Sequence, residues 1–446
     1  MTIDCLVAEI GSTTTIVNAF DLSKPAFLGR GMARTSVETD VREGLSKAIE
    51  DLRFNLGADR LSYGMMIASS SAAGGLKMTV HGLVKEMTVK AAEQAALNAG
   101  ANLHLVTAGP LDDDDMKKIN AIRPNIIVVA GGTDHGEKTI PFDNLVKVAG
   151  LGIPVIYAGN VANHDRIRAL GHDHVTIVEN VYPRVDDVNI FPLRKAIYDT
   201  FERHIVHAPG MAHVFDMVDK VIIPTPGAVM DATALYDAIK PGVVTLDVGG
   251  ATTDVHSVCD PRPEFQRDME GEPRAKRTVE GDLGVYVNRM HVLGKMSDRQ
   301  LENATGLSFE DARVLAQQEP FIPETEDGLK LVRALAGTCV KEALDRHAGD
   351  MRRVFSTNGI KVIPEGRDLS MVGTVILTGG ALLHHPDAEE IIRNHVLSSP
   401  TRLLFDPGVR ILRDRHYIMA SLGVLSAVDR EAAIRLLQDT LETEDR

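Results

Sequence analysis

The sequence lacks tryptophan altogether, and aromatic residues make up only 4% of its 446 positions. Stacking platforms of the kind that hold single-stranded nucleic acid are therefore scarce. Basic residues are also in deficit, because 48 Lys and Arg stand against 62 Asp and Glu and leave a net charge of −14. An acidic chain has no general attraction for DNA, RNA or anionic lipid. We therefore expect no nucleic-acid partner.

Cysteine is rare as well, with only Cys5, Cys259 and Cys339. The three are far apart in sequence and form neither a CxxC pair nor a disulfide framework, which is typical of a protein in a reducing cytosol. The first residues are acidic and lack a basic segment followed by an apolar run, so no signal peptide is expected. No apolar run approaches the ~20 residues that cross a bilayer. These absences predict a cytoplasmic protein with no membrane partner.

The chain is long enough for two or more domains, and its patterning indicates an α/β architecture. Short apolar runs bounded by turn residues predict buried strands at residues 5–10, 126–130, 155–158, 175–178, 221–223, 243–248 and 374–377. Apolar residues near a 3.6-residue period predict helices at residues 41–52, 88–98, 113–122, 193–204, 228–239 and 328–346. Residues 260–277 carry three prolines and alternating charge, so we expect a solvated excursion there.

One phrase occurs twice in the sequence. Residues 8–17 read AEIGSTTTIV, and residues 246–255 read LDVGGATTDV. Each copy predicts a strand, a glycine turn and a second strand, because glycine permits positive φ and leaves no side chain in the way. At a constant offset of 238 residues (247 minus 9), the matched pairs are Glu9 and Asp247, Gly11 and Gly249, Thr14 and Thr252, and Thr15 and Thr253.

Turns of this composition are able to bind phosphate, because backbone N–H groups and hydroxyls together form an anion-binding nest. A carboxylate directly before the turn is tolerable beside phosphate only if a cation or an attacking water lies between them, which implies Mg²⁺ held largely through water. Glu9 and Asp247 are therefore candidate catalytic and metal-associated residues. A pair of ordinary glycine hairpins is the alternative, and the second copy disfavours it. The candidate phosphate-binding residues are Gly11, Ser12, Thr13 and Thr14, and Gly249, Gly250, Ala251 and Thr252.

A third glycine turn follows an apolar strand near the C-terminus. Residues 374–386 read TVILTGGALLHHP, and Gly379 and Gly380 would let the backbone approach a flat ligand, which the resemblance described next implies is adenosine. In this chain order the three segments resemble those of the ATPase superfamily of actin, Hsp70 and the sugar kinases. The resemblance implies an α/β, two-lobed actin-like ATPase fold of duplicated ribonuclease-H-like domains, with ATP and Mg²⁺ in the cleft between the lobes.

The same resemblance implies a division of the chain. The first lobe would span residues 1–240 with an inserted α/β segment at about 70–220, and the second would span residues 241–446. Residues 226–239 and 416–428 would be connecting helices, with Ala420 and Gly423 letting them cross closely, and the last helices, residues 416–446, would pack back toward the first lobe. GDLG at residues 281–284 is similar to the turn that follows the second phosphate hairpin in Hsp70.

Three further strings resemble a narrower family. They are ASSSAAGGLKMTVHGLV at residues 68–84, VVAGGTDHGEK at 128–138 and RTVEGDLGV at 277–285. They are similar to the MutL/GlmL accessory proteins of glutamate mutase, which are unrelated to mismatch repair. The resemblance implies an ATPase that acts on subunits of an adenosylcobalamin-dependent mutase and promotes exchange of damaged cobalamin. Glu9 departs from the aspartate usual in the superfamily, and a homodimer is a further arrangement to consider.

Two other functions remain open on the same fold. A small-molecule kinase would need a carboxylate base poised over a substrate hydroxyl, and the sequence singles none out. An iron–sulfur ATPase would need cysteines at a dimer interface, whereas Cys5 and Cys259 fall on or beside the hairpin strands and leave only Cys339. Among the histidines, only His172 and His174 have a spacing that would place both on one face of a strand, and we expect a polar surface there.

Overall fold

The computed structural model describes residues 1–11, 14–35, 41–70, 76–98, 101–185, 187–205, 217–219, 222–266, 269, 272–320, 322–356 and 359–442. The chain divides into two compact units. Unit 1 comprises Met1–Ala232 and Ala420–Leu436, and unit 2 comprises Thr233–Met419 and Leu437–Arg446. Each unit is built around its own five-stranded sheet, and unit 1 contains a second one.

The first sheet of unit 1 has the order β10-β4-β1-β2-β3. The first three strands form an antiparallel meander, and β4 and β10 extend it in parallel from β1. β1 is buried almost throughout, as expected of a strand covered on both faces. The strands are β1 (Thr2–Ile10), β2 (Thr14–Asp21), β3 (Ala26–Arg34), β4 (Ser62–Ser70) and β10 (Ile222–Pro224), and α1 (Val41–Asn55) packs on β2 and β3.

The sheet of unit 2 repeats this topology strand for strand. Its order is β13-β12-β11-β16-β17, again an antiparallel meander extended by two parallel strands. The strands are β11 (Val243–Val248), β12 (Thr253–Val258), β13 (Ala275–Glu280), β16 (Thr374–Thr378) and β17 (Arg410–Arg413). The duplication of domains that the resemblance implied is therefore confirmed.

Unit 1 also contains a fully parallel sheet, with the order β6-β5-β7-β8-β9. Side chains alternate between two apolar cores, so helices cover both faces. The strands are β5 (Leu76–Gly82), β6 (Ala101–Ala108), β7 (Ile126–Gly131), β8 (Val155–Gly159) and β9 (Val175–Ile177). The helices are α2 (Lys90–Asn98), preceded by a π-turn (Lys85–Val89), α3 (Asp113–Ile122), α4 (Thr139–Ala149), α5 (His164–Ala169) and α6 (Ile190–Ile205).

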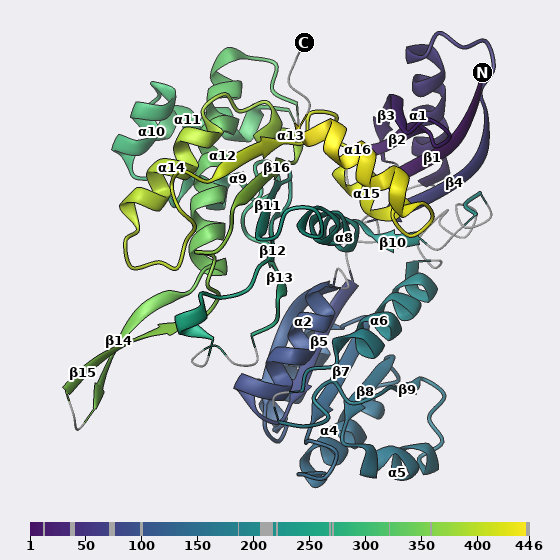
Figure 1. Cartoon of the computed structure of the whole chain (residues 1–446), viewed down its shortest axis with the longest axis vertical. Coiled ribbons are helices and arrows are strands. Elements are labelled where there is room, and N and C mark those ends of the chain that lie inside the picture. Colours follow the sequence, from purple (N-terminus) through teal and green to yellow (C-terminus); the bar gives the residue numbers. More distant parts are fainter. Residues whose placement is uncertain are drawn as a thin grey trace. The chain divides into compact units, whose positions relative to one another are not determined.

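Helices and a two-stranded ribbon complete the chain (Figure 1). The long helix α12 (Glu326–His347) packs on β11, β12 and β13. The other helices are α8 (Thr225–Asp237), α9 (Arg289–Leu293), α10 (Asp298–Thr305), α11 (Phe309–Gln318), α13 (Gly380–Leu383), α14 (Ala388–Ser398), α15 (Met419–Leu425) and α16 (Arg430–Glu442). The ribbon consists of β14 (Asp350–Ser356) and β15 (Gly359–Glu365).

The expectation of a solvated excursion over residues 260–277 is wrong at its C-terminal end. Ala275 begins β13, which pairs with β12, and the Arg277 side chain is fully buried. The charge of Arg277 suggested solvent exposure, but Asp254 neutralises it inside the unit, with Arg277 Nη2 donating to Asp254 Oδ1 at 3.1 Å. A buried charge is tolerable when it is paired in this way.

Candidate nucleotide site

The first candidate hairpin lies between β1 and β2 of unit 1. Gly11 N donates to Thr14 O at 3.0 Å and closes the turn, and Ile10 pairs with Thr15 in the register behind it. Ser12 and Thr13 lie outside the described residues. The turn therefore has the predicted strand–glycine–strand form at the ends that the structure describes.

The second candidate hairpin, between β11 and β12 of unit 2, closes in the same way. Gly249 N donates to Thr252 O at 2.9 Å. Gly250 O accepts from Tyr286 N at 2.9 Å and Asn288 Nδ2 donates to Ala251 O at 2.7 Å, so the segment after the GDLG turn holds the tip. Both hairpins therefore close with the same hydrogen bond, from the amide of the first glycine to the carbonyl of the threonine three residues later.

The tip of this second hairpin fits a phosphate group. In the part of the chain that the structure describes, the amides of Gly250, Ala251 and Thr252 have no hydrogen-bond acceptor. The carbonyl groups of the tip already accept hydrogen bonds, whereas these three amides donate none. The tip therefore offers hydrogen-bond donors to a ligand. Successive free N–H groups in a glycine turn form a nest for phosphate oxygens.

The diglycine turn lies against this hairpin within unit 2. Gly379 follows β16, which pairs in parallel with β11, and it has a φ of +85°, where glycine is favoured. A β-carbon on Gly379 would lie 2.5 Å from Val248 O and 2.6 Å from Asp247 Oδ1. A β-carbon on Gly380 would have no atom of another segment within 4 Å. The structure therefore brings Asp247, Gly249 and the diglycine turn together, with room beside Gly380.

Asp247 is partly exposed at the end of β11, and Asp254 lies directly opposite it on β12. Asp254 is buried and is bonded by both Nε and Nη2 of Arg277 and by Thr252 Oγ1. Burial raises the pKa of Asp254 above its ordinary value, and Arg277 opposes that rise. Sequence reasoning missed Asp254; the signal was that it is an acid where the first copy has Ile16.

Glu9 is bonded by side chains of its own unit. Ser421 Oγ, on α15, donates to Glu9 Oε1 at 2.5 Å, and Asn18 Nδ2 lies 3.3 Å from the same oxygen. Asn18 Nδ2 also donates to Ser421 Oγ at 2.9 Å. Glu9 is only 8% exposed, so this carboxylate is held in one position rather than free in solvent. Neither Asn18 nor Ser421 was predicted, because no local pattern marks them.

Asp414 organises the end of β16 that leads into the diglycine turn. It is fully buried and accepts from Thr378 Oγ1 at 3.1 Å, directly before Gly379. It also accepts from Thr440 Oγ1 and from the amides of Ile418 and Met419. Burial raises the pKa of Asp414, and these donors oppose the rise. The network fixes the strand that presents Gly379, and no spacing in the sequence pointed to it.

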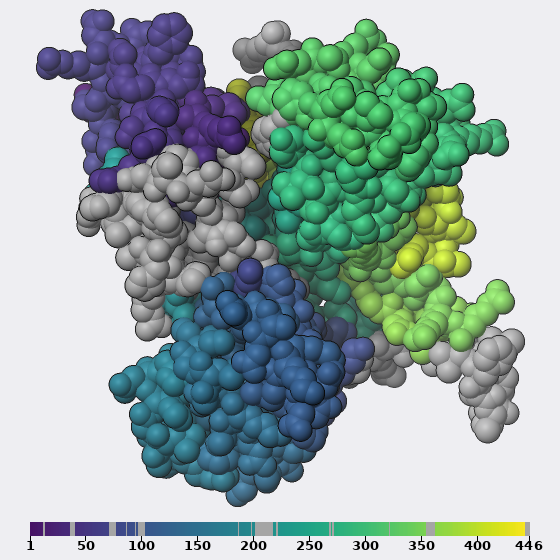
Figure 2. Space-filling model, turned by 180° about the vertical axis from the view of Figure 1, so that it is seen from behind, coloured from purple at the N-terminus to yellow at the C-terminus, as the bar shows by residue number. Residues whose placement is uncertain are grey.

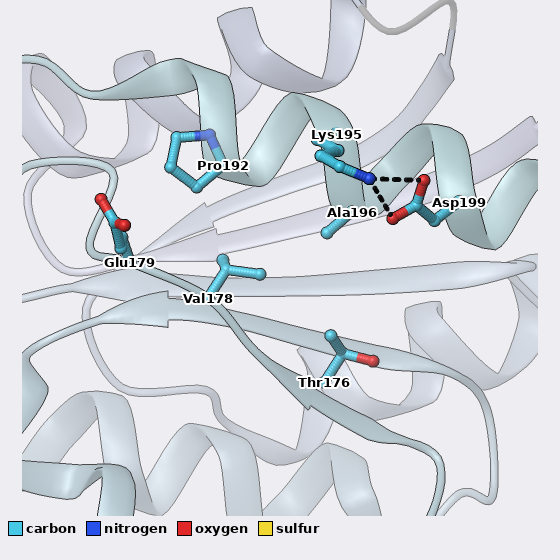
Figure 3. A pocket seen from close by; sticks show the side chains of 7 residues that line it. All are labelled: Thr176, Val178, Glu179, Pro192, Lys195, Ala196 and Asp199. Atoms are coloured by element: carbon cyan, nitrogen blue, oxygen red, sulfur yellow. Dashed lines mark hydrogen bonds and ion pairs between the residues drawn. The ribbon is translucent and has the colours of Figure 1, made fainter.

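A shallow cavity of about 330 Å³ in unit 1 contains none of the predicted site residues. Figure 3 shows it between the end of β9 and α6, with the Lys195–Asp199 ion pair at 3.1 Å on the helix. The side chains around it are Thr176, Val178, Glu179, Pro192, Lys195, Ala196 and Asp199. These side chains are a mixture of charged, polar and apolar groups, and they indicate no particular ligand or reaction.

The described ranges contain neither a cluster of metal ligands nor a membrane-spanning helix. Nowhere in them do three or more His, Cys, Asp or Glu side chains gather so that they could hold a metal ion. His174 instead bonds Ala149 O at 2.9 Å. No helix in these ranges combines the length and the apolar character needed to cross a membrane.

Two sheets of one topology, each bearing the same glycine hairpin, define the α/β actin-like ATPase fold. The sequence profile of the MutL protein family matches residues 5–441 of this chain. Protein MutL of Clostridium tetanomorphum is 32% identical over 457 residues, which cover 98% of this chain and 98% of that protein. The chain therefore belongs to the MutL protein family, and the resemblance predicted from its sequence is confirmed.

Solved structures with similarity to the chain have low sequence identity. Component A of (R)-2-hydroxyglutaryl-CoA dehydratase from Acidaminococcus fermentans is 11% identical, with a TM-score of 0.35 and coverage of 97% of this chain and 99% of that one. The activator of 2-hydroxyisocaproyl-CoA dehydratase from Clostridium difficile, with bound ADPNP, is 10% identical, with a TM-score of 0.34 and coverage of 99% of both. The fold assignment rests on the strand topology of the chain itself.

Proposed function

We propose that this protein is an ATP-dependent, chaperone-like reactivating factor for an adenosylcobalamin-dependent mutase of the glutamate mutase type. It acts in the cytoplasm, where it binds mutase subunits and hydrolyses ATP to promote exchange of damaged cobalamin. Membership of the MutL family supports the mutase as the partner. The observation that carries the ATPase is the repeated hairpin, with identical closure in both copies and unbonded amides at the second tip.

In this proposal, different residues bind different parts of the nucleotide. The amides and hydroxyls of the turns at residues 11–14 and 249–252 bind phosphate oxygens, and Gly379 and Gly380 lie against the adenosine. Mg²⁺ would neutralise phosphate charge and keep several waters. Asp247 orients the attacking water or a water of the metal shell, and Glu9 is its counterpart, held in position by Ser421. Catalysis of this kind depends mainly on positioning and on electrostatic stabilisation.

Replacement of Asp247 tests this assignment. Asp247→Asn keeps the shape of the side chain and removes its charge, so ATP turnover should fall about 10²-fold or more, as commonly follows the loss of one preorganised polar group. The matched control is Asp59→Asn, at an exposed aspartate of unit 1, and its turnover should be unchanged. Steady-state phosphate release in Mg²⁺ measures both variants. Full activity in Asp247→Asn would remove this residue from the mechanism.

Rescue of an inactivated enzyme tests the partner. Glutamate mutase inactivated by turnover should regain activity with this protein, ATP and fresh adenosylcobalamin, whereas Asp247→Asn should restore none. The same preparation is also incubated with sugars and short-chain acids. Stoichiometric phosphorylation of one of these, without rescue of any mutase, would identify a small-molecule kinase instead.

A further inference from the structure

A two-stranded ribbon extends from unit 2 without support along most of its length. β14 and β15 pair from Asp350 and Glu365 to Ser356 and Gly359. Figure 1 shows both arrows reaching away from the other elements of unit 2, and the light green atoms of this segment stand out in Figure 2. Within the described residues the sheet has only these two strands. Isolated two-stranded hairpins are marginal in water, which indicates that a further surface covers this one.

The base of the ribbon is anchored firmly. Met351 N donates to Thr401 O at 2.9 Å, and Leu403 N donates to Gly349 O at 2.9 Å. Arg367, two residues beyond β15, is 2% exposed and donates to Cys259 O at 3.1 Å and to Ser257 Oγ at 3.1 Å. The chain enters β14 almost directly from α12, which ends at His347. The direction of the ribbon is therefore set by the core of unit 2.

Beyond its base, where Asp350 and Glu365 lie, the ribbon exposes basic and apolar side chains. The register places Arg353 opposite Val362 and Arg352 opposite Ile363. Arg353 is exposed and has no ion-pair partner among the described residues, and Val362 is 49% exposed. Arg352 pairs with Glu365 at 2.5 Å, but both side chains are more than half exposed, so that pair contributes little. Cationic groups and apolar surface thus lie side by side.

The charge of the ribbon contrasts with that of the rest of the chain. Residues 350–365 contain Arg352, Arg353 and Lys361, and their two acidic residues, Asp350 and Glu365, both lie at the base of the ribbon. The ribbon therefore carries +1 (3 minus 2), and because the whole chain carries −14, the remainder carries −15. Edge-to-edge pairing with the same ribbon of a second copy would bring like charges together, which is destabilising when they lie directly opposite one another. An acidic partner surface is favoured instead.

We propose that the ribbon is a docking arm that binds an acidic surface with an adjoining apolar patch on the mutase. This inference rests on the proposed function and adds the surface through which the partner is bound. The arginines steer and orient the encounter, because complementary charge mainly raises association rates and specificity. Val362 loses its exposed apolar area on binding, which stabilises the complex.

A paired substitution on one face of the ribbon tests the proposal. Arg353→Glu with Val362→Asp reverses the charge and removes the apolar contact. The matched control combines Arg299→Glu with Ile322→Asp, at exposed residues elsewhere in unit 2. Affinity of each full-length protein for purified glutamate mutase subunits is measured by biolayer interferometry at low and high salt. The ribbon variant should bind about tenfold more weakly or worse, with a smaller salt dependence, whereas the control should bind normally.

Basal ATP turnover and the melting temperature should be unchanged in both variants, and Arg353→Gln supplies a milder change if the double variant unfolds. Equal affinity of the ribbon variant, with mutase rescue intact, would overturn the docking arm and leave the proposed function standing. If the unaltered protein neither binds nor rescues the mutase, both proposals fail. Loss of a dimer in sedimentation of the ribbon variant would assign the ribbon to a second copy and overturn the mutase as its occupant.

Discussion

Gly423 is the position where one added methyl group should do most damage. It lies on α15 where that helix crosses α8, and both Gly423 and Ala228 belong to unit 1. A β-carbon on Gly423 would lie 1.8 Å from Ala228 O and 2.6 Å from Ala228 C. These are backbone atoms and have no rotamer to change, so the two helices would have to separate.

The cost of Gly423→Ala follows from opposing effects. Alanine gains about 1 kcal/mol over glycine in a helix, whereas overpacking costs about 1–3 kcal/mol or more. Movement of α15 also loosens the bond of 2.5 Å from Ser421 to Glu9 and the bond of 2.9 Å from Asn18 to Ser421. Each buried group left unsatisfied costs about 1–3 kcal/mol. We expect a net loss of about 3 kcal/mol, or about 6–12 °C in the melting temperature of a unit of this size.

Scanning calorimetry of Gly423→Ala measures this loss, and phosphate release should fall as well because Glu9 is displaced. The control is Gly150→Ala at the end of α4, where φ is −64° and a β-carbon would meet only Lys147 O at 3.6 Å. That change should be neutral or stabilise by up to about 1 kcal/mol. If Gly423→Ala melts at the same temperature as Gly150→Ala and retains full ATP turnover, the close contact between α15 and α8 contributes nothing to stability and the reasoning is refuted.

Two further predictions concern buried titratable groups. Burial lowers the pKa of His81 to about 4, whereas an unfolded histidine has a pKa near 6.5. Between these two pH values the unfolded chain binds a proton that the folded chain does not. The free energy of unfolding should therefore fall by about 3 kcal/mol as the pH drops from 6.5 to 4. Urea titrations of the unaltered protein and His81→Gln should show a smaller pH dependence in the variant, and equal slopes would contradict the assignment. The thiols of Cys5, Cys259 and Cys339 are free and buried, and burial raises the pKa of Cys5 and of Cys339 to about 12. All three thiols should react with a thiol reagent only after denaturation, and rapid labelling of the native protein would contradict their burial. The protein purified without oxygen should be colourless, and a visible absorbance band with stoichiometric iron would contradict the absence of an iron–sulfur cluster.

The hairpins and the strands and helices expected from the sequence were predictable because their causes are local. Alternation, helical period and glycine turns depend on residues within a few positions of each other. The helix expected at residues 328–346 is α12 (Glu326–His347), and the strand expected at 243–248 is β11 (Val243–Val248). The repeated phrase likewise predicted two hairpins, and the resemblance to which it contributed implied the duplicated sheets that the strand orders confirm.

The partners of the site acids were not predictable in this way. Ser421 lies 412 positions from Glu9, and Arg277 lies 23 positions from Asp254, on the next strand of the sheet. Arg277 even suggested the opposite environment, because a charged residue near prolines is usually solvated. Its burial depends on a carboxylate that only the register of β12 and β13 places beside it.

The sequence alone therefore determined the class of fold, the family and the positions of the glycine turns, since each of these is written in short runs of neighbouring residues. Only the tertiary structure decided that Gly379 meets Asp247 and that Ser421 holds Glu9. It also decided that an arm bearing Arg353 extends from a buried base. The physical reason is that burial and pairing of polar groups depend on which distant segments meet, and the low dielectric inside the protein makes each such meeting either stabilising or costly.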